Sequence, residues 1–224
     1  MSEGRRRAPS HAGTARDGFD FTRHIRDLCT DLVTRLPDLA HIDMRQVAIG
    51  FSQTRKPGRH GIQASLTPMR FANGSLVEQR HGTWYMLQRL YDRDGVEMLY
   101  LLNFYLPRFM NEPFRDKLIT VVHELWHIGP RFDGDIRRHG GRCYAHSGSQ
   151  EKYDAHMARL AEKWMALDPP WSVSAFLNCD FNELRTTYGS VIGLKSMHPK
   201  LLPISNERAW LLQNAPARDR ATDT

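Results

Sequence analysis

One short pattern constrains this chain more than any other: H-E-x-x-H at residues 123–127, within a segment that reads as a helix from Glu112 to Ile128. Positions i and i+4 of a helix lie on the same face, one turn apart. His123 and His127 can therefore bind one metal ion, and the pattern is typical of zinc. Glu124 projects beside them, where it can act as general base on a zinc-activated water. The pattern predicts a zinc-dependent hydrolase.

A catalytic zinc needs a third protein ligand and an open position for water. His139 and His146 follow the motif in a loop rich in Gly and Arg, and either could fold back to the metal. Gly140 and Gly141 lie between them and make the loop adaptable, so the spacing alone does not choose. Tyr144 could donate a hydrogen bond to the tetrahedral intermediate, or pack half-buried against the sheet.

Four charged residues of the same loop have two interpretations each. Asp135 could orient a ligand imidazole, or it could be a plain turn residue. Arg137, Arg138 and Arg142 could stabilise an oxyanion, but exposed arginines in a polar loop are the commoner case. The turn Phe132-x-Gly134 can send the chain back toward the helix.

The stretch from His123 to Gly140, H-E-L-W-H-I-G-P-R-F-D-G-D-I-R-R-H-G, resembles the phage metallopeptidase family. The likeness consists of a helix-borne H-E-x-x-H, then Phe-x-Gly, an Arg and His-Gly. It implies a zincin-like fold and a peptidase activity. It also implies that His139, twelve residues after His127, takes the place of the family's later histidine. The resemblance therefore favours His139 as third ligand and leaves His146 nearer the substrate.

The order of elements along the chain predicts an α+β fold. A first helix is expected from Asp20 to Leu36, where apolar residues recur at helical spacing and Pro37 follows. Four strands are expected next, each bounded by turn signals: Gln46–Gln53, Gly61–Met69, Thr83–Tyr91 and Glu97–Leu106. They can form one mixed β-sheet packed against helices, with the H-E-x-x-H motif on a central helix.

Further helices are expected after the strands. Asn111 can cap the motif helix, and Gly129-Pro130 ends it. A third helix should begin near Ser149 and end at Asp168, with a short strand and a helix around Phe181–Tyr188 beyond it. The third helix has an apolar stripe that should belong to the core: Tyr153, Met157, Leu160, Trp164 and Leu167. We expect His156 on its surface or boundary face.

Composition indicates the domain limits and the cellular setting. Residues 1–18 read as a flexible tail, residues 19–205 as a zincin-like metallopeptidase domain, and residues 206–224 as a C-terminal extension whose last residues are flexible. Three widely spaced cysteines indicate no disulfide framework, which favours a cytoplasmic setting. The sequence contains no run of about 18 apolar residues, so no membrane span is expected.

The sequence thus predicts a zinc metallopeptidase that acts on a peptide or protein substrate. The strand Glu97–Leu106 could be an edge to which an extended peptide adds. Residues 45–93 hold eight Lys or Arg against two acidic residues, so a nucleic-acid-associated zinc protease is an alternative. A zinc-binding protein without protease activity and a metal-free interaction module are the others. Nothing in the sequence indicates an oligomeric state.

Overall fold

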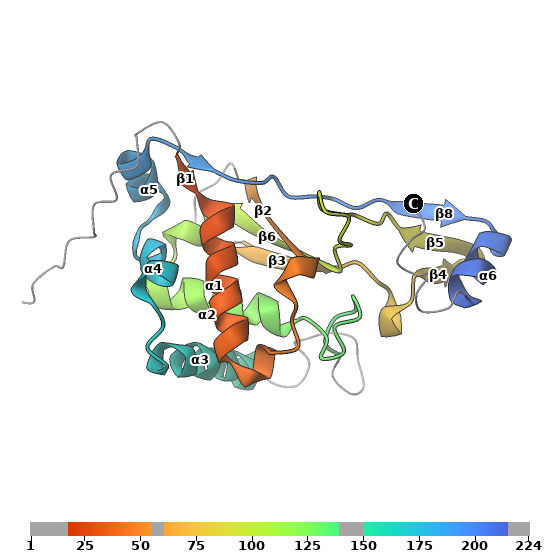
Figure 1. Cartoon of the computed structure of the whole chain (residues 1–224), viewed down its shortest axis with the longest axis horizontal. Helices are drawn as coiled ribbons and strands as arrows, with labels where there is room; N and C mark the ends of the chain where they lie inside the picture. Colours follow the sequence, from red (N-terminus) through yellow and green to blue (C-terminus); the bar gives the residue numbers. More distant parts are fainter. Residues whose placement is uncertain (1–17, 55–60, 139–149, 215–224) are drawn as a thin grey trace, which may run out of the picture.

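The central sheet of this α+β fold is mixed and has three strands in the order β2-β6-β3 (Figure 1). The computed structural model describes residues 18–54, 61–138 and 150–214. Strand β2 (Val47–Gln53) pairs in parallel with β6 (Tyr100–Leu106), and β3 (Ala64–Pro68) pairs with β6 in antiparallel. The run YLLNFYL makes β6 apolar on both faces, as a strand covered on both sides requires.

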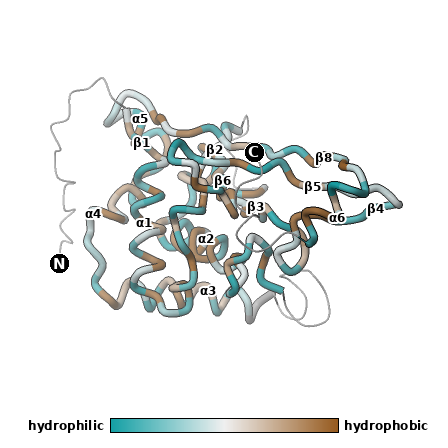
Figure 2. The backbone as a smooth tube through the Cα atoms, turned by 45° about the vertical axis from the view of Figure 1, so that its right-hand side comes forward, coloured by the Kyte–Doolittle hydropathy of each residue, from teal (hydrophilic) through white to brown (hydrophobic). Residues whose placement is uncertain are grey.

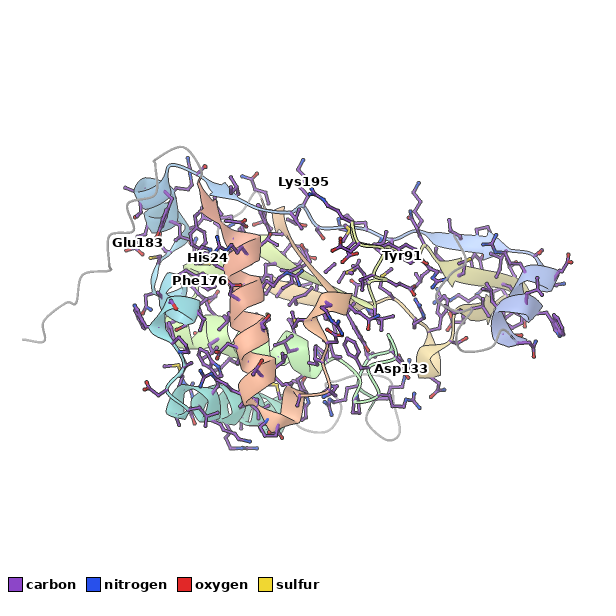
Figure 3. All side chains as sticks on the ribbon, in the orientation of Figure 1. His24, Tyr91, Asp133, Phe176, Glu183 and Lys195 are labelled. Atoms are coloured by element: carbon purple, nitrogen blue, oxygen red, sulfur yellow. The ribbon has the colours of Figure 1, made fainter. Side chains whose placement is uncertain are left out.

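The prediction that the strand at 97–106 offers a free edge is wrong. Strand β6 has β2 on one side and β3 on the other. Residues 193–200, which we call the strap, lie along the outer side of β2, with Lys195 above that strand (Figure 3). The N–H of Phe51 donates to the carbonyl of Leu194 at 2.9 Å, and the N–H of Ser196 donates to the carbonyl of Phe51 at 3.0 Å. Among the described residues, the free edge of this sheet is β3.

Three long helices pack with this sheet, at the positions that the sequence predicts. Helix α1 (Phe21–Arg35) is capped by the Asp20 carboxylate and ends before Pro37. The other two are α2 (Phe114–Trp126) and α3 (Gln150–Ala166). The expected cap of α2 is wrong: Asn111 instead accepts a hydrogen bond from the N–H of Phe181, because the chain takes a turn of 3-10 helix before α2 begins.

The hydrophobic core lies where these helices meet the central sheet, and Figure 2 shows their hydrophobic stretches gathered there. On α3, Met157, Leu160 and Trp164 are buried as predicted, and the indole of Trp164 donates to Asp31 of α1 at 2.8 Å. Leu167 is exposed, because α3 ends at Ala166 and Leu167 lies beyond the helix.

The remaining elements are short. Strand β1 (Phe19–Asp20) pairs in parallel with β7 (Val191–Ile192), and α4 (Trp171–Ser174) precedes α5 (Phe181–Tyr188). Helix α5 matches its prediction. Single turns of 3-10 helix occur at Pro37–Leu39, Met44–Gln46, Ala72–Gly74, Phe109–Asn111 and Ala175–Asn178.

The prediction of a single sheet is also wrong. A second sheet, ordered β4-β5-β8, lies at one end of the molecule with α6 (Asn206–Asn214) packed on it (right in Figure 1). Its strands are β4 (Val77–Arg80), β5 (Thr83–Leu87) and β8 (Leu201–Ile204). His81 and Gly82 both have positive φ and join β4 to β5 in a two-residue hairpin. This hairpin pairs β5 with its neighbour in sequence and keeps it away from β6.

We call this end the smaller lobe and the rest the larger lobe. The smaller lobe has its own hydrophobic cluster, made by Leu76, Val77, Met86 and Leu212. Three charged side chains lie between the two sheets and form the Glu97 cluster. The carboxylate of Glu97 accepts from Arg70 at 2.6 Å and from two nitrogens of Arg89, each at 2.7 Å. All three side chains are nearly buried.

Two further predictions concern cysteines and membranes. Cys29 and Cys179 are free thiols, and Cys143 lies outside the described residues. Within the described ranges, none of the helices has the length and apolar character needed to cross a membrane.

Candidate metal centre

Helix α2 places the H-E-x-x-H residues beside the sheet because its apolar face is fixed in the core. Leu118, Val121, Val122 and Leu125 are fully buried on that face. His123 is half-buried next to them, and His127 is the C-cap residue, still with helical φ and ψ. The i, i+4 spacing therefore keeps both imidazoles on the same side of the helix, as predicted.

The two imidazoles converge. Their Nε2 atoms are 2.9 Å apart, and their rings lie 4.6 Å apart at 78° to each other. At this separation one imidazole donates a hydrogen bond to the other. Two nitrogens of a tetrahedral zinc site, each about 2.0–2.1 Å from the metal, lie about 3.3–3.4 Å apart. A small rotation of the rings would therefore bring the pair to the spacing that zinc requires, and both nitrogens are of the type that zinc prefers. Among the residues that the structure describes, no third His, Cys, Asp or Glu completes a metal-binding group with them.

The predicted third ligands fall in a stretch about which the structure is silent. His139, Arg142, Tyr144 and His146 lie outside the described residues, so their roles stay predictions. The chain leading to them is described. Phe132 and Gly134 have positive φ, and the turn brings Ile136 back alongside Ile128. This return to the end of α2 is what the Phe-x-Gly pattern predicts.

Glu124 is the buried acid of the motif. Burial raises its pKa to about 7, although the backbone N–H of Leu66 donates to the carboxylate and works in the other direction. Leu66 lies on β3, the free edge of the central sheet. The N–H of Tyr105 donates to Gln63 and that of Met69 to Leu99, so alternation along the antiparallel ladder turns the N–H of Leu66 outward, away from β6.

Tyr153 is a site residue that the sequence analysis missed. It was predicted to be core, but it is only half-buried, with its ring 5.1 Å from that of His123 at 76° and 6.2 Å from that of His127 at 26°. Burial and the nearby Glu124 carboxylate both raise the pKa of its hydroxyl. The available signal was its hydroxyl at the head of an otherwise apolar stripe on α3.

Arg137 holds the end of the motif helix, and the prediction that it is an exposed loop residue is wrong. It is half-buried, with its guanidinium 3.8 Å from the centre of the Trp126 ring. Its backbone N–H donates to the carbonyl of His127 at 2.7 Å, and its Nε donates to the carbonyl of Trp126 at 2.8 Å. These bonds satisfy two carbonyls that a helix end otherwise leaves open.

Asp135 and His156 have structural surroundings. The buried Asp135 carboxylate accepts from the N–H groups of Asn73 and Ile136 and pairs with Arg138 at 2.7 Å. It thus fixes the loop and does not orient either motif imidazole. His156 is half-buried with its ring 4.6 Å from that of Trp126, as expected for a boundary residue.

Four of the five described arginines in the basic segment 45–93 are paired with carboxylates, and Arg55, Lys56 and Arg59 lie outside the described residues. Arg45 pairs with Asp43, Arg80 with Glu78, and both Arg70 and Arg89 with Glu97. A nucleic-acid surface needs cations that are free to meet phosphates. The four paired arginines therefore give no support to the nucleic-acid alternative, which stays a prediction.

Comparisons of the chain with protein-family models, with curated protein sequences and with solved structures find no match. The resemblance to the phage metallopeptidase family therefore stays a prediction that rests on residues 123–140. What supports a function is the chemistry of the site itself.

Proposed function

We propose that this protein is a zinc-dependent metallopeptidase with a zincin-like fold. The observation that carries the proposal is the convergence of the His123 and His127 Nε2 atoms, 2.9 Å apart, beside the buried carboxylate of Glu124. Two neutral imidazoles and one carboxylate, on a single helix, are the residue types that such an enzyme needs.

The three motif residues have separate roles. His123 and His127 would hold the zinc, together with a third ligand for which His139 is the first candidate and His146 the second. Zinc bound there would lower the pKa of a water ligand to about 7 and polarise the carbonyl to be attacked. Glu124 accepts a proton from the attacking water and returns it to the leaving amine. A carboxyl group that lies next to the two histidines on the same helix is placed for both transfers.

The free edge of β3 supports a peptide as the substrate. Its outward backbone groups, those of Ala64 and the carbonyl of Leu66, can pair with an extended chain by β-augmentation. The N–H of Leu66 reaches the Glu124 carboxylate, so a peptide paired to this edge would pass beside the general base. The predicted edge role is thereby assigned to β3 in place of the strand at 97–106.

Zinc content and peptide hydrolysis together test the proposal. We expect about one zinc per chain by elemental analysis of the purified protein, and loss of that zinc in His123→Ala and His127→Ala. We also expect cleavage of a peptide library by the zinc-loaded protein. Zinc content that is substoichiometric and unchanged by both substitutions would overturn the proposal.

Chelation separates the catalytic zinc from the alternative of a structural zinc in a protein without protease activity. A structural zinc contributes folding free energy, so removing it unfolds the protein. The described core is built from apolar contacts between helices and sheet. We therefore expect the chelated protein to lose activity and keep its circular dichroism spectrum, with recovery when zinc is added back.

A further inference from the structure

We propose that Tyr153 is a positioning residue of the metal centre, whose ring fixes the orientations of the His123 and His127 imidazoles before the metal binds. The inference rests on the zinc site of the proposed function, but not on peptide hydrolysis. It concerns a residue outside the H-E-x-x-H motif, on a different helix.

The ring of Tyr153 meets the two imidazoles in two different ways. It is nearly perpendicular to that of His123, at 76°, and closer to parallel with that of His127, at 26°. The imidazoles are themselves nearly perpendicular to one another. One aromatic ring thus contacts both partners of the pair, and a rotation of either imidazole would break one of these contacts.

Such a constraint is needed because the terminal torsion of a histidine has broad preferences of its own. Ligand imidazoles that are free to rotate must be ordered when the metal binds, and this ordering lowers the affinity. Groups that surround a metal ligand and hold its ring typically change metal affinity by about 10–100-fold when they are removed.

Tyr153 can act in this way because its helix is firmly anchored. Met157 and Trp164, farther along α3, are fully buried, and Leu160 is nearly so. The bond from the Trp164 indole to Asp31 ties α3 to α1 at 2.8 Å. The ring of Tyr153 is therefore presented from a fixed element, which is what an orienting group requires.

The contacts are made by the ring, so the hydroxyl can be separated from it experimentally. Tyr153→Phe keeps the ring and should bind zinc within about threefold of the wild type, because the surroundings of both imidazoles are preserved. Tyr153→Leu removes the ring and should weaken zinc binding about tenfold or more. Leu160→Ala is the matched control: it lowers stability on the same helix and should leave zinc affinity unchanged.

Zinc dissociation constants from titration against a competing chelator are the first readout, and the visible spectrum of the cobalt-substituted protein is the second. We expect the spectrum of Tyr153→Phe to match the wild type and that of Tyr153→Leu to change, since ligand orientation alters the metal's coordination. If Tyr153→Leu does not fold, Tyr153→Met replaces it, because the flexible thioether fills a similar space without an aromatic ring.

The outcomes separate this inference from the proposed function. A wild-type protein that binds no zinc overturns the proposed function, whatever Tyr153 does. Wild-type zinc binding that persists unchanged in Tyr153→Leu, or in its replacement, overturns the role of Tyr153 alone. A Tyr153→Phe variant as weak as Tyr153→Leu overturns it as well, because the ring would then not be the group that matters.

Discussion

The pKa values of Glu124 and Glu97 are shifted in opposite directions, and the neighbours of the two carboxyl groups explain why. Burial raises the pKa of Glu124 to about 7, and only a backbone N–H acts against it. Burial would also raise the pKa of Glu97, but two arginines outweigh it and hold the pKa below the ordinary value. Burial without a paired cation thus favours the protonated form of Glu124, whereas the two arginines favour the charged form of Glu97.

Replacement of Glu124 by glutamine should abolish proton transfer while it keeps the shape of the site. We expect Glu124→Gln to retain zinc and fold, and to lower kcat for peptide hydrolysis by about 10²–10⁴-fold. Kinetics and elemental analysis of the same sample provide the measurement. Glu162→Gln, on the surface of α3 and paired with Arg115, is the control. Activity retained in Glu124→Gln would mean that another group is the base.

Substitutions of the two loop histidines test the third ligand. His139→Ala should weaken zinc affinity by about tenfold or more, and His146→Ala should leave zinc bound and reduce turnover. The basis is the turn at Phe132 and Gly134, which returns the chain to the end of α2 just before His139. Chelator competition on both variants measures the effect. The reverse order of affinities would make His146 the ligand.

At this scale the sequence predicts the motif residues well, because the i, i+4 spacing is a property of any helix. It could not identify Tyr153. Helical periodicity says that Tyr153 shares a face with Met157 and Trp164, but it does not say which part of that face meets core and which part meets the imidazoles. That distinction depends on how α3 packs against α2, which is a tertiary property.

At the scale of elements, the path of β3 matters most for the proposed activity. This strand is the free edge among the described residues, and its outward amide at Leu66 reaches Glu124. A proline at Leu66 would remove that amide without removing a bond to β6, because this N–H points away from the ladder.

Comparing Leu66→Pro with Leu66→Ala tests the role of the backbone N–H at position 66. Both variants lose the leucine side chain, but only the proline loses the N–H. We expect kcat/KM for a peptide to fall about tenfold further in Leu66→Pro, because Glu124 loses the hydrogen bond that it accepts from this N–H. Circular dichroism checks that both variants fold. Equal kinetics for the two would show that the bond from this amide to Glu124 does not contribute to catalysis.

The sequence predicts the position of β3 closely and assigns the wrong strand to the edge. The extent of a strand follows from local patterns of β-branched and apolar residues, but these patterns do not determine which strands it pairs with. The hairpin at His81 and Gly82 keeps β5 out of the central sheet, and the strap meets the outer side of β2. Both pairings depend on segments with little periodic pattern of their own, so the predicted single sheet was wrong.

On the scale of the whole molecule, the Glu97 cluster links segments from the two lobes. Glu97→Gln leaves two nearly buried guanidinium groups without their carboxylate and should cost about 3 kcal/mol of folding free energy at pH 7. The exposed pair of Glu78 and Arg80 supplies the control, since Glu78→Gln should change stability by about 0.5 kcal/mol or less. Urea denaturation of both variants measures the difference.

The same cluster predicts a pH dependence with a definite sign. The pKa of Glu97 is lower in the folded protein than in the unfolded chain, so its contribution is complete above the unfolded value of about 4.3. The contribution is lost as the pH falls through the folded pKa. The stability difference between wild type and Glu97→Gln should therefore shrink in acid. A difference that stays constant down to pH 3 would mean that Glu97 is not the group responsible.

The strap also determines when the β2 edge of the central sheet is covered during folding. Residues 194–196 pair with β2, but they leave the ribosome long after β2 and β6 have emerged. Until then the nascent sheet exposes a row of unpaired backbone groups along β2, which another chain can extend into an aggregate. Because this protection comes from contacts so distant in sequence, it forms late and slowly. Expression yield should depend more on the residues of the strap than their exposure in the finished fold indicates.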